Sequence, residues 1–144
     1  MDAFTSLRIS ATALKAQRIR LDTITSNMAN AETTRTPDGG PYQRKMVVFR
    51  SQPLSFSDHL SRHYTDKCAD GVRVAEIVTD QSASKLVYDP QHPDANSNGY
   101  VAMPNVDILK ETTDMMLATR AYEANVTAIK ASKRMALKAL EIGR

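Results

Sequence analysis

The first thirty residues place an apolar side chain at most of the positions that follow one another by three or four. Within this stretch Leu7, Leu14, Leu21 and Met28 lie in strict seven-residue register, and no Gly or Pro interrupts the chain before Pro37. Such a pattern is typical of an amphipathic helix with a narrow apolar seam. At 1.5 Å per residue the predicted helix over residues 1–30 is roughly 40 Å long. The seam runs through Phe4, Leu7, Ala11, Leu14, Arg18, Leu21, Thr25 and Met28.

The last forty residues repeat the same spacing. Pro104 ends the secondary-structure element before it, and Asn105 suits the N-cap position of a following helix. Asp107 falls in the first turn of that helix, where the helix dipole favours an acidic residue. These signals predict a second helix, roughly 50–55 Å long. Its expected seam is Ile108, Thr112, Met115, Thr119, Tyr122, Val126, Ile129, Lys133, Ala136 and Leu140.

Both predicted seams are narrow and contain polar members, among them Arg18, Thr25 and Lys133. Two terminal helices of matching periodicity are most economically paired along their seams. A two-helix pair of this kind cannot bury enough surface to be securely stable by itself. The pattern therefore predicts a part that assembles with copies or relatives of itself.

The pattern changes between the two helices. Residues 38–41 are typical of a turn, and residues 42–49 of a strand. Residues 72–78 and 85–88 favour two further strands, whereas residues 51–70 are polar, lack a dependable period and indicate a loop. The predicted fold class is α+β. Its parts are an N-terminal helix over 1–30, a small β-rich middle segment over 31–104 and a C-terminal helix over 105–144.

Length and composition limit the class of protein. With 144 residues and 15.9 kDa the chain has the size of one ordinary domain. No stretch approaches the roughly 20 apolar residues that a transmembrane helix needs, so we expect no membrane insertion. Residues 1–30 carry no apolar segment followed by a small-residue cleavage site, so we expect no cleaved signal peptide.

The basic character of the chain raises the question of nucleic acid. The net charge is +3, but residues 1–30 contribute +2, residues 31–105 contribute −1 and residues 106–144 contribute +2. No third of the chain is a strong basic block, and its cations are not interleaved with stacking aromatics. We therefore expect no nucleic-acid partner, although a DNA-binding protein remains the alternative that the charge supports.

Few residues have the spacing of a chemical site. Asp89, His92 and Asp94 could ligate a metal in a hydrolase, but their spacing matches no standard metal site, and two prolines explain this segment as a rigid turn. His59 and His63 lie four positions apart, as in half of a zinc-binding motif, but no acidic residue lies between them. Cys68 is the single cysteine of the chain, so it has no second cysteine to pair with. We expect no enzyme, metal or cofactor. A basic stripe of Lys130, Arg134 and Lys138 fits a solvated helix face or a surface that meets a partner.

Four motifs, in order along the chain, identify a family. The first is Asn-x-Ala-Asn-x-x-Thr, which spans residues 27–33 and closes the first predicted helix. With it the chain resembles the axial proteins of the bacterial flagellar rod and hook, and in particular the proximal rod subunits of the basal body. The matching segments are residues 26–34, 35–42, 87–96 with 99–106, and 120–126 with 135–137.

This resemblance implies a structural subunit without a cofactor. The terminal helices would join into a coiled-coil-like inner domain, and the middle segment would form an outer one. Copies would pack helically into a hollow, torque-transmitting rod across the periplasm, after export by the flagellar type III apparatus. Implied partners are other proximal rod subunits, the rod-base protein and export gate, distal rod proteins and copies of itself. A distal rod or hook subunit is the nearest alternative, but those relatives usually carry larger outer domains.

The resemblance also suggests roles for single residues. Asn27, Asn30 and Thr33 would satisfy backbone groups where the first helix ends, and Pro37 would begin a stiff connector. The polar turn formed by Arg120, Tyr122, Glu123 and Asn125 would bond across subunits or to the loop after Asn30, unless it stabilises only its own helix. The remaining expected assembly positions are Leu7, Leu14, Leu21, Met28, Met115 and Ile129.

Overall fold

The computed structural model describes residues 3–37, 39–52 and 71–142. The chain begins with helix α1 (Ala3–Ala29) and ends with helix α3 (Ile108–Ile142). Between them in the sequence lie four strands, β1 (Lys45–Ser51), β2 (Val72–Thr79), β3 (Lys85–Tyr88) and β4 (Tyr100–Met103). The predicted α+β class is confirmed. The interpretation of residues 51–70 as a loop lies largely outside the described residues, as do His59, His63 and Cys68.

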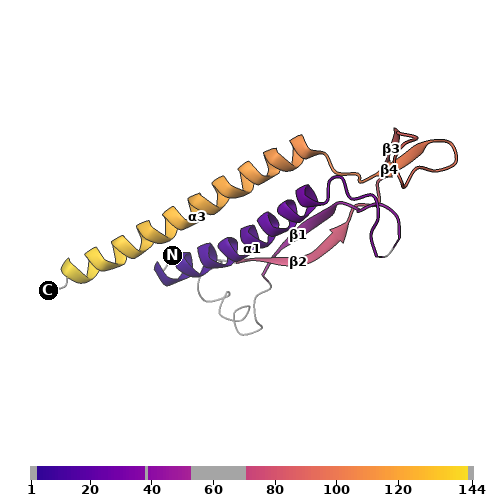
Figure 1. The fold of residues 1–144 in the computed structure, drawn as a ribbon. Coiled ribbons are helices and arrows are strands. Elements are labelled where there is room, and N and C mark those ends of the chain that lie inside the picture. The colour runs from indigo at the N-terminus through magenta and orange to yellow at the C-terminus, as the bar shows by residue number, and fades with distance from the viewer. Residues whose placement is uncertain (1–2, 38, 53–70, 143–144) are drawn as a thin grey trace.

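The two helices lie side by side and antiparallel (Figure 1). Asn27 near the end of α1 contacts Glu111 near the start of α3, and Ser6 near the start of α1 contacts Ser132 in the last third of α3. Because α3 has 35 residues and α1 has 27, the C-terminal turns of α3 extend past the beginning of α1.

Small and polar side chains fill the contact between the helices. The most buried residues of α3 are Glu111, Ala118 and Ser132, which lie in seven-residue register. The predicted α3 seam is therefore partly wrong, because Thr119, Lys133 and Leu140 are exposed, whereas Met115 and Ile129 are half-buried. Short side chains at the contact let the two backbones approach closely.

Helix α1 also buries a different set from the one predicted. Its deepest side chains are Ala16, Thr23, Ile24 and Asn27, whereas Leu7, Leu14, Leu21 and Met28 are half-buried. The reason is that α1 packs against α3 and also against β1 and β2. A helix with neighbours on two sides buries a wider surface than one seam, so the strict heptad does not mark its most buried face.

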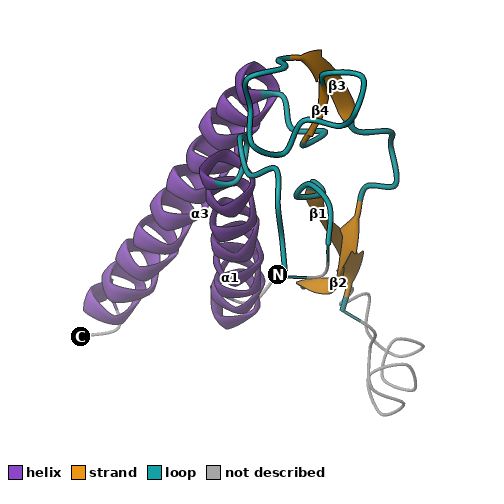
Figure 2. Cartoon of the chain, turned by 45° about the vertical axis from the view of Figure 1, so that its right-hand side comes forward, coloured by secondary structure: helices purple, strands orange, loops and turns teal. Residues whose placement is uncertain are grey.

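Strands β1 and β2 form an antiparallel hairpin along α1, with a register shift between Val48 and Phe49 (Figures 1 and 2). The hairpin is attached to the helix at Thr12, whose hydroxyl accepts a hydrogen bond of 3.1 Å from the N–H of Val72. A Cβ on Gly71 would lie 2.7 Å from that hydroxyl oxygen. The absence of a side chain at Gly71 therefore permits this close approach.

Strands β3 and β4 form a second antiparallel hairpin beyond the end of the helix pair (Figure 1). Strand β3 coincides with the predicted 85–88, whereas β4 was not predicted and is defined by its antiparallel pairing with β3. The loop between them closes through hydrogen bonds from Asp89 N–H to Gly99 O and from Gly99 N–H to Asn96 O, both 2.9 Å.

We predict that Gly99→Ala loosens this second hairpin. Gly99 has φ +77°, and an added Cβ would lie 2.9 Å from the ring of Tyr88. Gly40→Ala is the matched control, since Gly40 has φ +81° but open space around it. The extra clash should cost the hairpin about 1–2 kcal/mol beyond the control. Hydrogen exchange of the Val101 amide measures this, and equal protection in the two variants would contradict the prediction.

Candidate functional site

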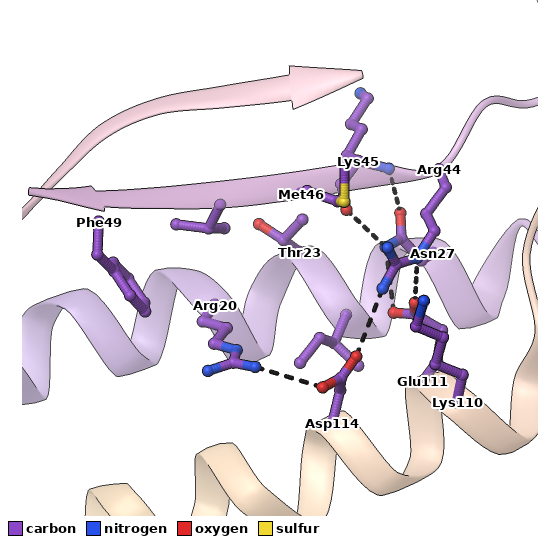
Figure 3. Close-up of a pocket in the computed structure, with 12 residues that line it drawn as sticks. Arg20, Thr23, Asn27, Arg44, Lys45, Met46, Phe49, Lys110, Glu111 and Asp114 are labelled. Atoms are coloured by element: carbon purple, nitrogen blue, oxygen red, sulfur yellow. Dashed lines mark hydrogen bonds and ion pairs between the residues drawn. The ribbon is translucent and has the colours of Figure 1, made fainter. Parts of the chain in front are cut away.

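A buried polar junction lies where α1 ends, β1 begins and α3 begins (Figure 3). Its centre is Asn27, which is only 1% exposed. The Asn27 amide donates to the carbonyl of Lys45 at 2.8 Å and to the carboxylate of Glu111 at 3.1 Å. Its oxygen accepts from the hydroxyl of Tyr42 at 3.0 Å and from the N–H of Lys45 at 2.9 Å. One side chain thus ties together three elements and uses its full hydrogen-bonding capacity.

Local geometry explains how the chain returns to Asn27 after the helix. The Asn30 side chain donates a hydrogen bond to the carbonyl of Ser26 at 2.8 Å and accepts one from the hydroxyl of Thr33 at 3.3 Å. Gly39 and Gly40, both with positive φ, complete the turn. The N–H of Tyr42 then reaches back to the carbonyl of Thr33 at 3.0 Å. The reversal delivers Tyr42 and Lys45 to the end of α1.

A layer of ion pairs adjoins Asn27. Glu111 has no exposed surface, and Arg44 holds it through an Nε–Oε1 contact of 2.6 Å. Asp114 lies between two guanidinium groups, at 3.3 Å from Arg20 and 3.4 Å from Arg44. Buried ion pairs of this kind contribute geometric specificity more dependably than net stability. Here they fix the start of α3 against both α1 and β1.

The start of α3 differs in one respect from the sequence-based expectation. The N-cap is Asp107, whose carboxylate accepts from the N–H of Leu109 at 2.9 Å. Asn105, the expected cap, instead accepts from the N–H of Arg44 at 2.7 Å and donates to the carbonyl of Asp80 at 3.1 Å. Asn105 therefore links Arg44, the residue before β1, to the turn after β2.

The turn after β2 carries the clearest electrostatic shift. The hydroxyl and the N–H of Ser82 both donate to the carboxylate of Asp80. These bonds to the charged form lower the pKa of Asp80 below its ordinary value, with smaller contributions from Arg44 and Lys110. Asp80 consequently remains ionised to a lower pH than a free aspartate.

The polar side chains of the junction hold α1, β1 and α3 together. Its cleft is lined by paired cations and carboxylates and by apolar residues of β1. Within the described ranges, no three His, Cys, Asp or Glu residues are grouped as metal ligands, and no helix is long and apolar enough to cross a membrane. Of the residues considered as metal ligands, His92 accepts at Nδ1 from the N–H of Asp94, and Asp94 accepts from the hydroxyl of Thr34.

The structure brings together only some of the residues that the sequence suggested. Asn27, Asn30 and Thr33 do meet at the end of α1. However, Asn27 bonds the backbone of β1, and Thr33 bonds the Asn30 side chain, so only Asn30 satisfies a backbone group of the helix end by its side chain. Pro37 is exposed in the following turn.

The expected positions on α3 lie away from the junction. Arg120 and Glu123 are exposed and pair within the helix at 3.6 Å, and the Asn125 amide donates to the carbonyl of Ala121. Tyr122 is 36% exposed. Met115 and Ile129 are half-buried along the helix contact.

Sequence reasoning missed the charged residues of the junction, namely Arg44, Glu111 and Asp114. Glu111 lies in the first turn of α3, where an acid is ordinarily explained by the helix dipole alone. No local pattern relates it to Asn27, which is 84 positions away. The one available signal for a polar junction was the run of polar residues over 110–114, at the start of the helix.

We predict that Asn27→Ala destabilises the chain by about 2–3 kcal/mol, because it removes the partner of the Tyr42 hydroxyl, the side-chain partner of the Lys45 backbone and one of the hydrogen bonds to Glu111. Asn30→Ala is the matched control and should cost about 1 kcal/mol or less, since it removes only two local hydrogen bonds, one to the carbonyl of Ser26 and one from the hydroxyl of Thr33. Urea unfolding of the purified chain followed by circular dichroism measures both. Equal effects of the two variants would show that Asn27 does not hold the junction together.

Comparison with known proteins places this architecture. Residues 7–35 match the family model described as flagella basal body rod protein, and residues 97–142 match that of the flagellar basal body rod FlgEFG protein C-terminal region. The chain is 51% identical to the flagellar basal-body rod protein FlgC of Bacillus subtilis, with all of both chains covered. It is 45% identical to FlgC of Borreliella burgdorferi, with 99% and 98% covered, and 40% identical to FlgC of Salmonella typhimurium, with 94% of each covered. The chain belongs to the FlgC family of flagellar basal-body rod proteins, a family of structural proteins and not of enzymes.

Proposed function

We propose that this chain is a structural subunit of the proximal part of the flagellar rod, where it assembles helically with other rod proteins into a hollow shaft that transmits torque across the periplasm. The observation that carries the proposal is the identity of 40–51% to rod proteins named FlgC over nearly the whole chain. The subunit would leave the cytoplasm through the flagellar type III apparatus without a cleaved signal.

The outward surface of α3 supports an assembled role. Ile108, Leu109, Met116 and Leu117 are 52%, 81%, 60% and 59% exposed, although they belong to a folded helix. Apolar surface of this extent on a soluble chain is typical of protein interfaces. The two helices would form the inner part of the rod wall, and the middle segment would form the outer part.

The partners follow from that position in the rod. They would be copies of this chain, other proximal rod subunits, the rod-base protein at the export gate and the distal rod proteins. The assembly surface would include the half-buried Leu7, Leu14, Leu21, Met28, Met115 and Ile129, and the polar turn formed by Arg120, Tyr122, Glu123 and Asn125. Asn27, Asn30, Thr33 and Pro37 would set the direction in which the chain leaves the inner wall.

Deletion of the gene tests the proposed function directly. Electron microscopy of basal bodies from the deleted cells should show the inner-membrane ring without a rod or hook, because later subunits would have nothing to build on. Expression of the intact chain from a plasmid is the control and should restore the rod. Complete rods and hooks in the deleted cells would refute the proposal.

We further predict that Glu123→Ala with Asn125→Ala abolishes rods while leaving the helicity of the purified chain unchanged. Among the described residues, Glu123 pairs with Arg120 and the Asn125 amide bonds the carbonyl of Ala121, both within α3, so a loss of rods with unchanged helicity would point to contacts between subunits. Thr127→Ala is the matched control, since its exposed hydroxyl bonds only the carbonyl of Glu123. Intact rods and motile cells with the double variant would show that the polar turn stabilises only its own helix.

A further inference from the structure

The second hairpin presents an aromatic face that the described chain does not cover. Val87 and Val101 lie opposite each other on its inner side, and Val101 has no exposed surface. The outer side carries Leu86, Tyr88 and Tyr100, which are 66%, 66% and 43% exposed and form what we name the hairpin face. The two tyrosine rings meet edge to face with centroids 5.3 Å apart. The hairpin face is therefore a rigid apolar surface exposed to solvent.

The segment of the chain that carries the hairpin face is acidic. Residues 80–107 contain four carboxylates and one cation, Lys85, which gives a net charge of −3 at pH 7. Asp89 directly follows Tyr88 in the chain and is exposed. Tyrosine rings attract cations through their faces, and neighbouring carboxylates strengthen that attraction. The complementary surface is therefore basic and apolar. The four carboxylates are Asp80, Asp89, Asp94 and Asp107.

The last turns of α3 have this complementary composition. Lys130, Arg134 and Lys138 follow one another at four-residue spacing, with Leu137 beside them, on the side of the helix opposite the buried Ser132. We name these four exposed residues the tail face. Residues 130–141 contain four cations and one acid, with a net charge of +3. Leu137 is 51% exposed, and Lys138 contacts Glu141 at 2.6 Å.

We propose that the hairpin face of one copy of this chain docks on the tail face of a second copy. Leu137 would pack on the tyrosine rings, Arg134 would lie beside Leu86 and Asp89, and Lys138 would lie over the rings. The inference rests on the proposed function. The two faces lie at opposite ends of an elongated molecule, so each copy offers both (Figure 1). Heterologous contacts of this type can repeat from copy to copy along a helical assembly.

Cross-linking in assembled basal bodies tests which protein covers the hairpin face. A photoreactive phenylalanine at position 86 of the full chain should give cross-linked dimers of this chain, with the second attachment within residues 130–141. The same group at Glu76, an exposed position on β2, is the control and should give none to that segment. Attachment to a different protein, or to another segment, would overturn the inference. Recovery of the chain in those basal bodies would still leave the proposed function standing.

Charge reversal tests the chemistry of the contact. Leu86→Lys and Arg134→Glu should each lower the number of completed rods at least tenfold. The first change would place a lysine beside Arg134, and the second would place a glutamate beside Asp89. The two changes in one chain should restore rods, since the new lysine and the new glutamate would face each other between copies. Arg18→Glu, the same charge change at an exposed position of α1, is the control. Normal rods with both single variants, or no recovery in the combined variant, would overturn the inference.

Discussion

The hydrogen bonding of one buried amide constrains the whole arrangement. Asn27 is removed from water, so its two donors and two acceptors must all be satisfied within the protein. Their partners lie on Tyr42, Lys45 and Glu111, which forces the turn after α1, strand β1 and the start of α3 to meet at one point. The neighbouring pair of Arg44 and Glu111 adds charge specificity to the same point. The direction of both helices follows from this junction.

The helix contact beyond the junction differs from an ordinary apolar core, because it buries small side chains and leaves large apolar ones exposed. Ala118, Ser132 and Ala16 lie inside, whereas Leu109 and Met116 point outward. Small buried side chains allow close approach but remove little apolar area from water, so they contribute modestly to stability. The larger apolar side chains remain available for other chains, in keeping with the proposed role as an assembling subunit. A polar junction then defines the geometry that the weak helix contact does not.

Several elements could be predicted because their signals are local. Strand β3 was predicted with its observed bounds, and the two helices followed from their apolar period and the lack of breakers. The buried face of each helix could not be obtained in this way. In α1, contacts with α3 and with the first hairpin widen the buried surface beyond the heptad of Leu7 and Leu14. In α3, the buried positions are occupied by Glu111 and Ser132, which a hydrophobic pattern does not select.

The sequence by itself determined the helices, most of the strands and the family, because these depend on periodicity and on motifs that are contiguous in the chain. Only the tertiary structure decided that Asn27 bonds Lys45 and Glu111, that Asn105 bonds Arg44 rather than capping α3, and which side of each helix is buried. The physical reason is that helix periodicity is set by neighbours three and four positions apart. Contacts between residues tens of positions apart depend on how the elements pack, which no local pattern records.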